Sequence, residues 1–192
     1  MDATELLTAD HNRLRGLFAR FESAKEEDDL EQMTALTATI LAELEVHTTI
    51  EEEIFYPELV DLNEEIHESI TEGIEEHNVA KKQMAEVAGM PPDTDEWAAK
   101  VTVLLEVVEH HKDEEESTLF PKVRSATSAD DREQLGVRLD ARKAQLGAPT
   151  LADKSDLTKQ ELVDLAKEQE IPGRSTMSQE ELAATVAPPP SP

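Results

Sequence analysis

The sequence contains no cysteine among its 192 residues. This absence excludes disulfide bonds, thiolate metal ligands and thiol-based catalysis, and it is compatible with a reducing compartment. The chain also lacks an apolar run of membrane-spanning length, and its first residues, Met-Asp-Ala-Thr-Glu, lack the basic and apolar regions of a secretory signal. We therefore expect a soluble, cytoplasmic protein without membrane contact.

Basic residues are scarce, because 18 Lys and Arg stand against 44 Asp and Glu, for a formal net charge of -26. Such a surface repels phosphate backbones and anionic lipid, which disfavours direct nucleic-acid binding by the main domain. The same surface attracts cations. Most of these carboxylates are nevertheless expected to be solvated, so charge alone does not indicate a metal site.

Hydrophobic periodicity predicts an all-α protein built on an antiparallel four-helix bundle. Apolar residues recur at helical spacing in four long segments, and the apolar stripe of each segment includes one histidine. The segments are about 4–23, 30–56, 63–88 and 94–124. Pro57 and Pro121 are expected to end or kink the second and fourth helices, because proline lacks an N–H and crowds the preceding turn.

The rest of the chain is expected to form smaller parts. The full division is 1–125 for the bundle, 126–147 for an additional amphipathic helix, 148–187 for a module of two short helices and 188–192 for a disordered tail. The additional helix should pack along the outside or the end of the bundle. Two capping-box patterns, which start at Thr158 and Ser178, open the two short helices.

One motif occurs twice, and in each copy a histidine precedes a glutamate by four residues and a proline by ten. Each copy also has an upstream histidine, 36 residues before His47 and 34 before His111. Residues four apart share one face of a helix, so each copy directs an imidazole and a carboxylate at the same point. The six residues brought together in this way are His11, His47, Glu51, His77, His111 and Glu115.

These residues predict a metal site, because a glutamate that faces an apolar core without a partner costs several kcal/mol or more. Six nitrogen and oxygen ligands exceed what one tetrahedral zinc needs and suit two metals bridged by the two glutamates. Imidazole with carboxylate suits iron, manganese or zinc. Iron is favoured over manganese and zinc because this ligand set supports redox chemistry with dioxygen or peroxide.

The order His, His-x-x-x-Glu, His, His-x-x-x-Glu, with its Tyr-Pro and Phe-Pro endings, resembles the hemerythrin-like (HHE cation-binding) domain over roughly residues 1 to 125. The resemblance implies a non-heme di-iron centre with the six residues as ligands. Oxygen-carrying hemerythrins have a fifth histidine at the position that Gly73 occupies here. We therefore favour a more open site over simple oxygen carriage, unless Glu43, Tyr56 or a water fills the gap.

Several neighbours of the six residues are given weaker roles. Tyr56 and Phe120 occupy equivalent places, and Tyr56 is interpreted as a packing residue. His110 points about 100° away from His111 on the same helix and should face solvent. Three glutamates next to the expected ligands are interpreted as solvated, namely Glu52, Glu53 and Glu116.

Residues 157–186 resemble the Rho N-terminal-like, SAP-like helix-turn-helix module, some examples of which handle DNA. The segment is acidic, so a protein partner or a tethering role is at least as well supported as DNA binding.

Two functions stay open at this point. The first is a di-iron protein that binds or turns over a small oxidant (peroxide, dioxygen or nitric oxide) in oxidative-stress defence or sensing, with catalase-like peroxide decomposition as one form. The alternative is a non-catalytic iron-binding buffer or sensor that signals through its C-terminal module.

Overall fold

The computed structural model describes residues 1–147, together with 162–163, 167 and 182, and every regular element within them is helical. In chain order these elements are α1 (Ala3–Glu26), α2 (Leu30–Ile50), the π-helical turn η1 (Glu51–Phe55), α3 (Tyr56–Leu59), α4 (Glu64–Ala88), α5 (Asp95–Glu114), the π-helical turn η2 (Glu115–Leu119), α6 (Phe120–Ala126) and α7 (Ala129–Gln145). The all-α prediction is therefore confirmed. The expected module at 148–187, apart from a few helical positions, and the expected tail at 188–192 lie outside the described residues.

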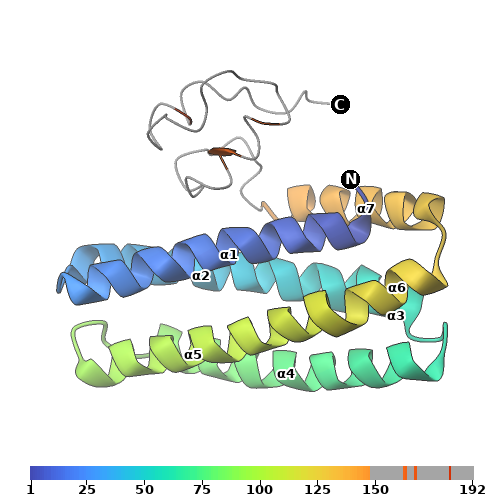
Figure 1. Ribbon diagram of the computed structural model, residues 1–192. Helices are drawn as coiled ribbons and strands as arrows, with labels where there is room; N and C mark the ends of the chain where they lie inside the picture. The colour runs from blue at the N-terminus through green and yellow to red at the C-terminus, as the bar shows by residue number, and fades with distance from the viewer. Residues whose placement is uncertain (148–161, 164–166, 168–181, 183–192) are drawn as a thin grey trace.

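The long helices form two antiparallel hairpins, α1 with α2 and α4 with α5 (Figure 1). The hairpins lie side by side, so that neighbouring helices alternate in direction, as in an up-down-up-down bundle. The helix α7 lies along the outside of α1, close to the N-terminus (Figure 1). In the part of the chain that the structure describes, no helix is both long and apolar enough to cross a membrane.

Side-chain caps define where the bundle helices begin. Asp2 accepts from the backbone N–H of Glu5 while the Glu5 carboxylate accepts from the backbone N–H of Asp2, so a capping box opens α1. The side chain of Asn63 accepts from a backbone N–H in the first turn of α4, and that of Thr94 does so at α5. These oxygens pair N–H groups that the first turn of a helix leaves without an internal partner.

Pro57 and Pro121 were expected to end or kink their helices, and the structure shows that they do not end them. Each proline stands in the first turn of a short helix, α3 or α6, that continues directly from a π-helical turn. The missing N–H of a proline is tolerated at that position. The long helices consequently continue past Glu51 and Glu115, the two glutamates of the repeated motif, with one π-helical turn starting at each.

The core is divided into two apolar clusters along the bundle axis. One cluster surrounds Leu14, Phe21 and Trp97, and the other surrounds Leu7 and Phe55. In sequence, each of the four motif histidines falls between residues of the first cluster and residues of the second. A polar layer therefore crosses an otherwise apolar interior.

The helix α7 is the amphipathic helix expected within 126–147. Leu135 and Leu139 are buried in the second apolar cluster. Arg132 donates to Asp2 at 3.1 Å and Arg142 donates to Glu53 at 2.7 Å. Apolar burial and ion pairs together attach α7 to the first hairpin.

Candidate metal centre

The four motif histidines come from four different helices, and all of them are buried. Their Nε2 atoms face one another in two pairs, at 3.1 Å for His11 and His47 and at 2.9 Å for His77 and His111. His110 has a side chain that is 67% exposed, so the prediction that His111 and not His110 faces inward is confirmed.

Glu51 and Glu115 lie between the two hairpins. The Oε2 atom of Glu51 is 3.3 Å from Nε2 of His47, on its own helix, and 3.4 Å from Nε2 of His77, on the other hairpin. Glu115 repeats this arrangement, at 3.8 Å from His111 and 3.3 Å from His11. All six residues that the repeated motif singled out are thus brought together, and each glutamate faces a histidine of both hairpins.

This cluster has the donor atoms of a cation site. Ligand atoms of His11, His47, Glu51 and Glu115 lie within 4.8 Å of one another, and those of Glu51, His77 and His111 form a second such group. Both carboxylate oxygens of Glu51 and the Oε2 atom of Glu115 are buried with no hydrogen-bond partner. Buried anionic oxygens of this kind need a positive partner, and a metal cation would supply it.

The protonation of the site favours the same conclusion. Burial lowers the pKa of His47 and of His77 to about 4, so both imidazoles are neutral at neutral pH. Burial, reinforced by the charge of Glu115, raises the pKa of Glu51 well above its usual value. The unpartnered carboxylate of Glu51 therefore takes up a proton more readily than a solvated glutamate does, and a cation at this site would take the place of that proton.

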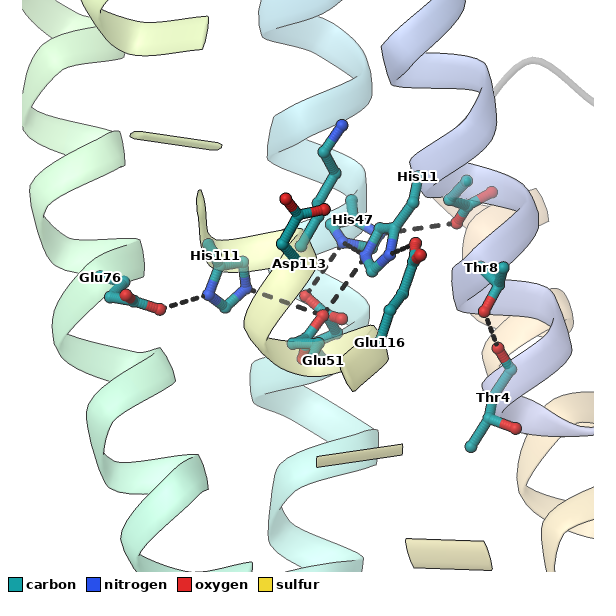
Figure 2. A network of polar contacts seen from close by, with 12 residues as sticks. Thr4, Thr8, His11, His47, Glu51, Glu76, His111, Asp113 and Glu116 are labelled. Carbon is teal, nitrogen blue, oxygen red and sulfur yellow. Dashed lines mark hydrogen bonds and ion pairs between the residues drawn. The ribbon is translucent and has the colours of Figure 1, made fainter. Parts of the chain in front are cut away.

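A second set of carboxylates contacts the Nδ1 atoms of the histidines, on the side of each ring that faces away from the cluster. The Nδ1 atom of His11 is 2.8 Å from Glu116, that of His77 is 2.9 Å from Glu52 and that of His111 is 2.7 Å from Glu76. Figure 2 shows Glu116 and Glu76 directed at the rings of His11 and His111. Because Nδ1 donates outward, the Nε2 lone pair is directed into the cluster, as in many metal-binding histidines.

These outer carboxylates correct two sequence-based interpretations. Glu52 and Glu116 were expected to be solvated, yet each accepts a hydrogen bond from a buried histidine of the opposite hairpin. Asp10 is the related residue for His47, although its oxygen is 3.7 Å from Nδ1 and thus beyond hydrogen-bonding distance. The available signal was an acidic residue next to His11, Glu51, His77 and Glu115 in the sequence, which in so acidic a chain carries little information.

Each crossing carboxylate is also held by a cation. Arg15 donates to Glu116 at 2.9 Å, and Lys81 donates to Glu52 at 2.7 Å. Both cations stand four residues after the first histidine of their hairpin. Although partial burial raises it, the hydrogen bonds from His11 and Arg15 lower the pKa of Glu116 to about 2. The crossing contacts of one hairpin are therefore repeated in the other, as are the contacts among the four histidines, Glu51 and Glu115.

Tyr56 and Phe120 occupy equivalent positions but differ in their contacts. The ring of Phe120 is stacked on that of His11, with centroids 5.7 Å apart. The ring of Tyr56 lies 5.6 Å from that of His77, and its hydroxyl also donates to Oε1 of Glu115 at 3.0 Å. Tyr56 is therefore more than the packing residue that the sequence suggested.

Glu43 is not part of the cluster. Its carboxylate accepts from Arg13 at 2.8 Å, in a buried ion pair between α1 and α2. The position of the missing fifth histidine is instead bordered by Tyr56: a Cβ atom on Gly73 would lie 3.2 Å from the tyrosine hydroxyl oxygen and 3.4 Å from His111. A cavity of about 120 Å³ adjoins these three residues.

Comparison with known proteins is consistent with this geometry. The model of the hemerythrin HHE cation binding domain matches residues 2–123. A DNA nickase of Nostoc sp. is 25% identical over 146 residues, which cover 76% of this chain but 40% of the nickase. Uncharacterized proteins of Mycobacterium bovis and Mycobacterium tuberculosis are 29% identical over 151 residues, 78% of this chain and 90% of each relative. No solved structure matches the chain.

Proposed function

The chain belongs to the hemerythrin HHE cation-binding domain family, and from this premise we propose that its bundle holds two non-heme iron ions and binds or turns over a small oxidant. The oxidants considered are peroxide, dioxygen and nitric oxide. The observation that carries the proposal is the set of buried glutamate oxygens, without hydrogen-bond partners, that face four imidazole nitrogens.

The proposed ligand sets follow the two hairpins. His11 and His47 bind one iron, and His77 and His111 bind the other. Glu51 and Glu115 stand between the two, because each lies near one histidine of either hairpin. Nitrogen and oxygen donors without thiolate suit iron, and two metals use the ligands better than one would.

Side chains around the site would orient the metal ligands, exclude bulk water and contact a bound oxidant. When bound, iron supplies the electrons that reduce an oxidant. The outer carboxylates orient the histidines, and the two apolar clusters keep bulk water from the layer between them. Tyr56 places a hydroxyl between Glu115 and the cavity at Gly73, where it can form a hydrogen bond to a small ligand.

Metal analysis of the full chain tests this proposal. We expect about two irons per chain, with an absorption spectrum that changes on addition of azide or peroxide. Glu51→Ala should lose iron and reactivity together, because it removes the carboxylate shared by both ligand groups. Glu45→Ala, on the exposed face of the same helix, is the matched control and should retain both. An alanine variant at Glu51 that keeps its iron would refute the bridging role.

One contact favours the second function, an iron-binding buffer or sensor. Lys143 of α7 forms an ion pair with Asp10, whose carboxylate lies 3.7 Å from His47. A change in charge at the metal would therefore act on the ion pair between Asp10 and Lys143, and through it on the position of α7. The number of peroxide molecules consumed separates the two functions, because an enzyme consumes many per site and a sensor about one.

DNA nicking is not carried over from the Nostoc relative. The chain covers 40% of that protein, and its strong acidity opposes contacts with phosphate groups.

A further inference from the structure

The cavity beside Gly73 differs in character from the rest of the centre. It has a volume of about 120 Å³ and reaches from the exposed Glu72 to the buried His111 and Glu115. Given the proposed di-iron function, we infer that this cavity is the ligand entrance, that the ligand reaches the metal position of His77 and His111, and that the entrance selects small uncharged molecules.

The first argument is the difference between the two sides of the centre. Gly73 stands four residues before His77, and the residue four before His11 is Leu7. Leu7 is fully buried in an apolar cluster with Phe120, and α7 covers this side through Leu135 and Leu139. On the opposite side a glycine replaces the leucine. Gly73 therefore leaves space next to the metal position of His77 and His111, whereas Leu7 fills the equivalent space beside His11.

The second argument is size. A volume of about 120 Å³ has room for a few water-sized molecules, and it is well below the roughly 300–1,000 Å³ of ordinary organic-ligand pockets. A molecule of two to four atoms fits, and an organic substrate of ordinary size does not. This limit agrees with peroxide, dioxygen or nitric oxide as ligands.

The third argument is charge. Glu72, Glu76 and Glu114 line the outer part of the cavity, and the described residues that line it include no lysine or arginine. Lys122 is near its edge, where it donates to the hydroxyl of Ser69 and the carbonyl oxygen of Glu65. The entrance thus has a negative potential that disfavours anions such as azide or superoxide.

The fourth argument is the direction of the hydrogen bonds at the inner end. The hydroxyl of Tyr56 donates its proton to Glu115, so the phenol oxygen presents lone pairs to the space beside Gly73. An acceptor in this place suits a ligand that can donate a hydrogen bond, such as hydrogen peroxide. It does not suit an anion.

Ligand affinities of the iron-loaded full chain test the charge selection. In Glu72→Gln/Glu114→Gln we expect azide to bind more tightly, by roughly two- to threefold for each charge removed, while the affinity for nitric oxide stays the same. Added salt should strengthen azide binding in the wild type, because it screens the repulsion. Glu75→Gln/Glu106→Gln is the matched control, since it removes two exposed charges from the same helices outside the cavity.

The position of the entrance is tested with Gly73→Ala. The added methyl group occupies the space beside Tyr56, and we expect nitric oxide to associate at least about threefold more slowly with unchanged iron content. Gly89→Ala, at the end of the same helix, should not alter the rate.

The outcomes separate the two proposals. A chain purified without iron would overturn the proposed function and this inference with it. Iron-loaded protein whose azide affinity is the same in the two double variants, or whose association rate ignores Gly73→Ala, would overturn the inference alone.

Discussion

Tyr56 is the residue at which the two halves of the centre differ chemically, because its counterpart Phe120 has no hydroxyl. Tyr56→Phe removes the hydroxyl that donates a hydrogen bond to Oε1 of Glu115, and this buried oxygen loses that hydrogen bond. We expect the fold to be retained and the free energy of unfolding of the metal-free protein to fall by about 1–3 kcal/mol. Urea unfolding measures this change. Equal stability of the two proteins would mean that the hydrogen bond contributes nothing in solution.

The motif residues could be predicted from sequence, whereas their outer partners could not. An i, i+4 spacing places a histidine and a glutamate on one helix face whatever the rest of the chain does, so His47 and Glu51 follow from local geometry. The contact of Glu52 with His77 depends on how the two hairpins pack and on the π-helical turn that starts at Glu51. Neither of these has a local sequence signal.

At the scale of elements, α7 approaches the start of α1 so closely that only glycine fits at residue 136. A Cβ atom there would lie 2.5 Å from the carbonyl oxygen of Met1 and 3.0 Å from the backbone nitrogen of Ala3. The sequence predicted this helix as an amphipathic segment within 126–147. It did not predict which face of the bundle the helix covers, because the apolar stripe of α7 fits several surfaces.

We expect Gly136→Ala to destabilise the protein. The clash is with backbone atoms, and overpacking of this kind costs about 1–3 kcal/mol, more than the gain of up to about 1 kcal/mol from replacing glycine in a helix. Hydrogen exchange of the α7 amides should accelerate first. Gly89→Ala is the control, because its Cβ would meet only ordinary contacts at 3.6 Å. Similar exchange in the two variants would contradict the close approach.

At the scale of the whole molecule, metal binding should be coupled to proton release. Burial raises the pKa of Glu51. Burial also disfavours protonated His11, but the nearby carboxylates of Glu115 and Glu116 outweigh it and raise the pKa of His11. Both groups therefore hold their protons more tightly in the metal-free protein than at their ordinary pKa values, and a metal must displace those protons.

Iron affinity should accordingly increase with pH until the pH exceeds both pKa values. His47 and His77 are already neutral, with pKa values of about 4, and add nothing to this dependence until the pH falls toward that value. Titration calorimetry in buffers of different ionisation enthalpy counts the protons released. A pH-independent affinity between pH 6 and 8 would show that Glu51 and His11 bind the metal without losing protons.

The crossing of Glu52 to His77 and of Glu116 to His11 has a consequence for assembly. The outer carboxylate of each hairpin accepts a hydrogen bond from a histidine of the other hairpin. Neither hairpin alone therefore provides the hydrogen-bond partners of all its histidines. Two identical copies of one hairpin, related by a dyad, would nevertheless satisfy every such contact between themselves. The architecture is that of a symmetric dimer of hairpins joined into one chain, in which the equivalent positions Leu7 and Gly73, or Phe120 and Tyr56, hold different residues.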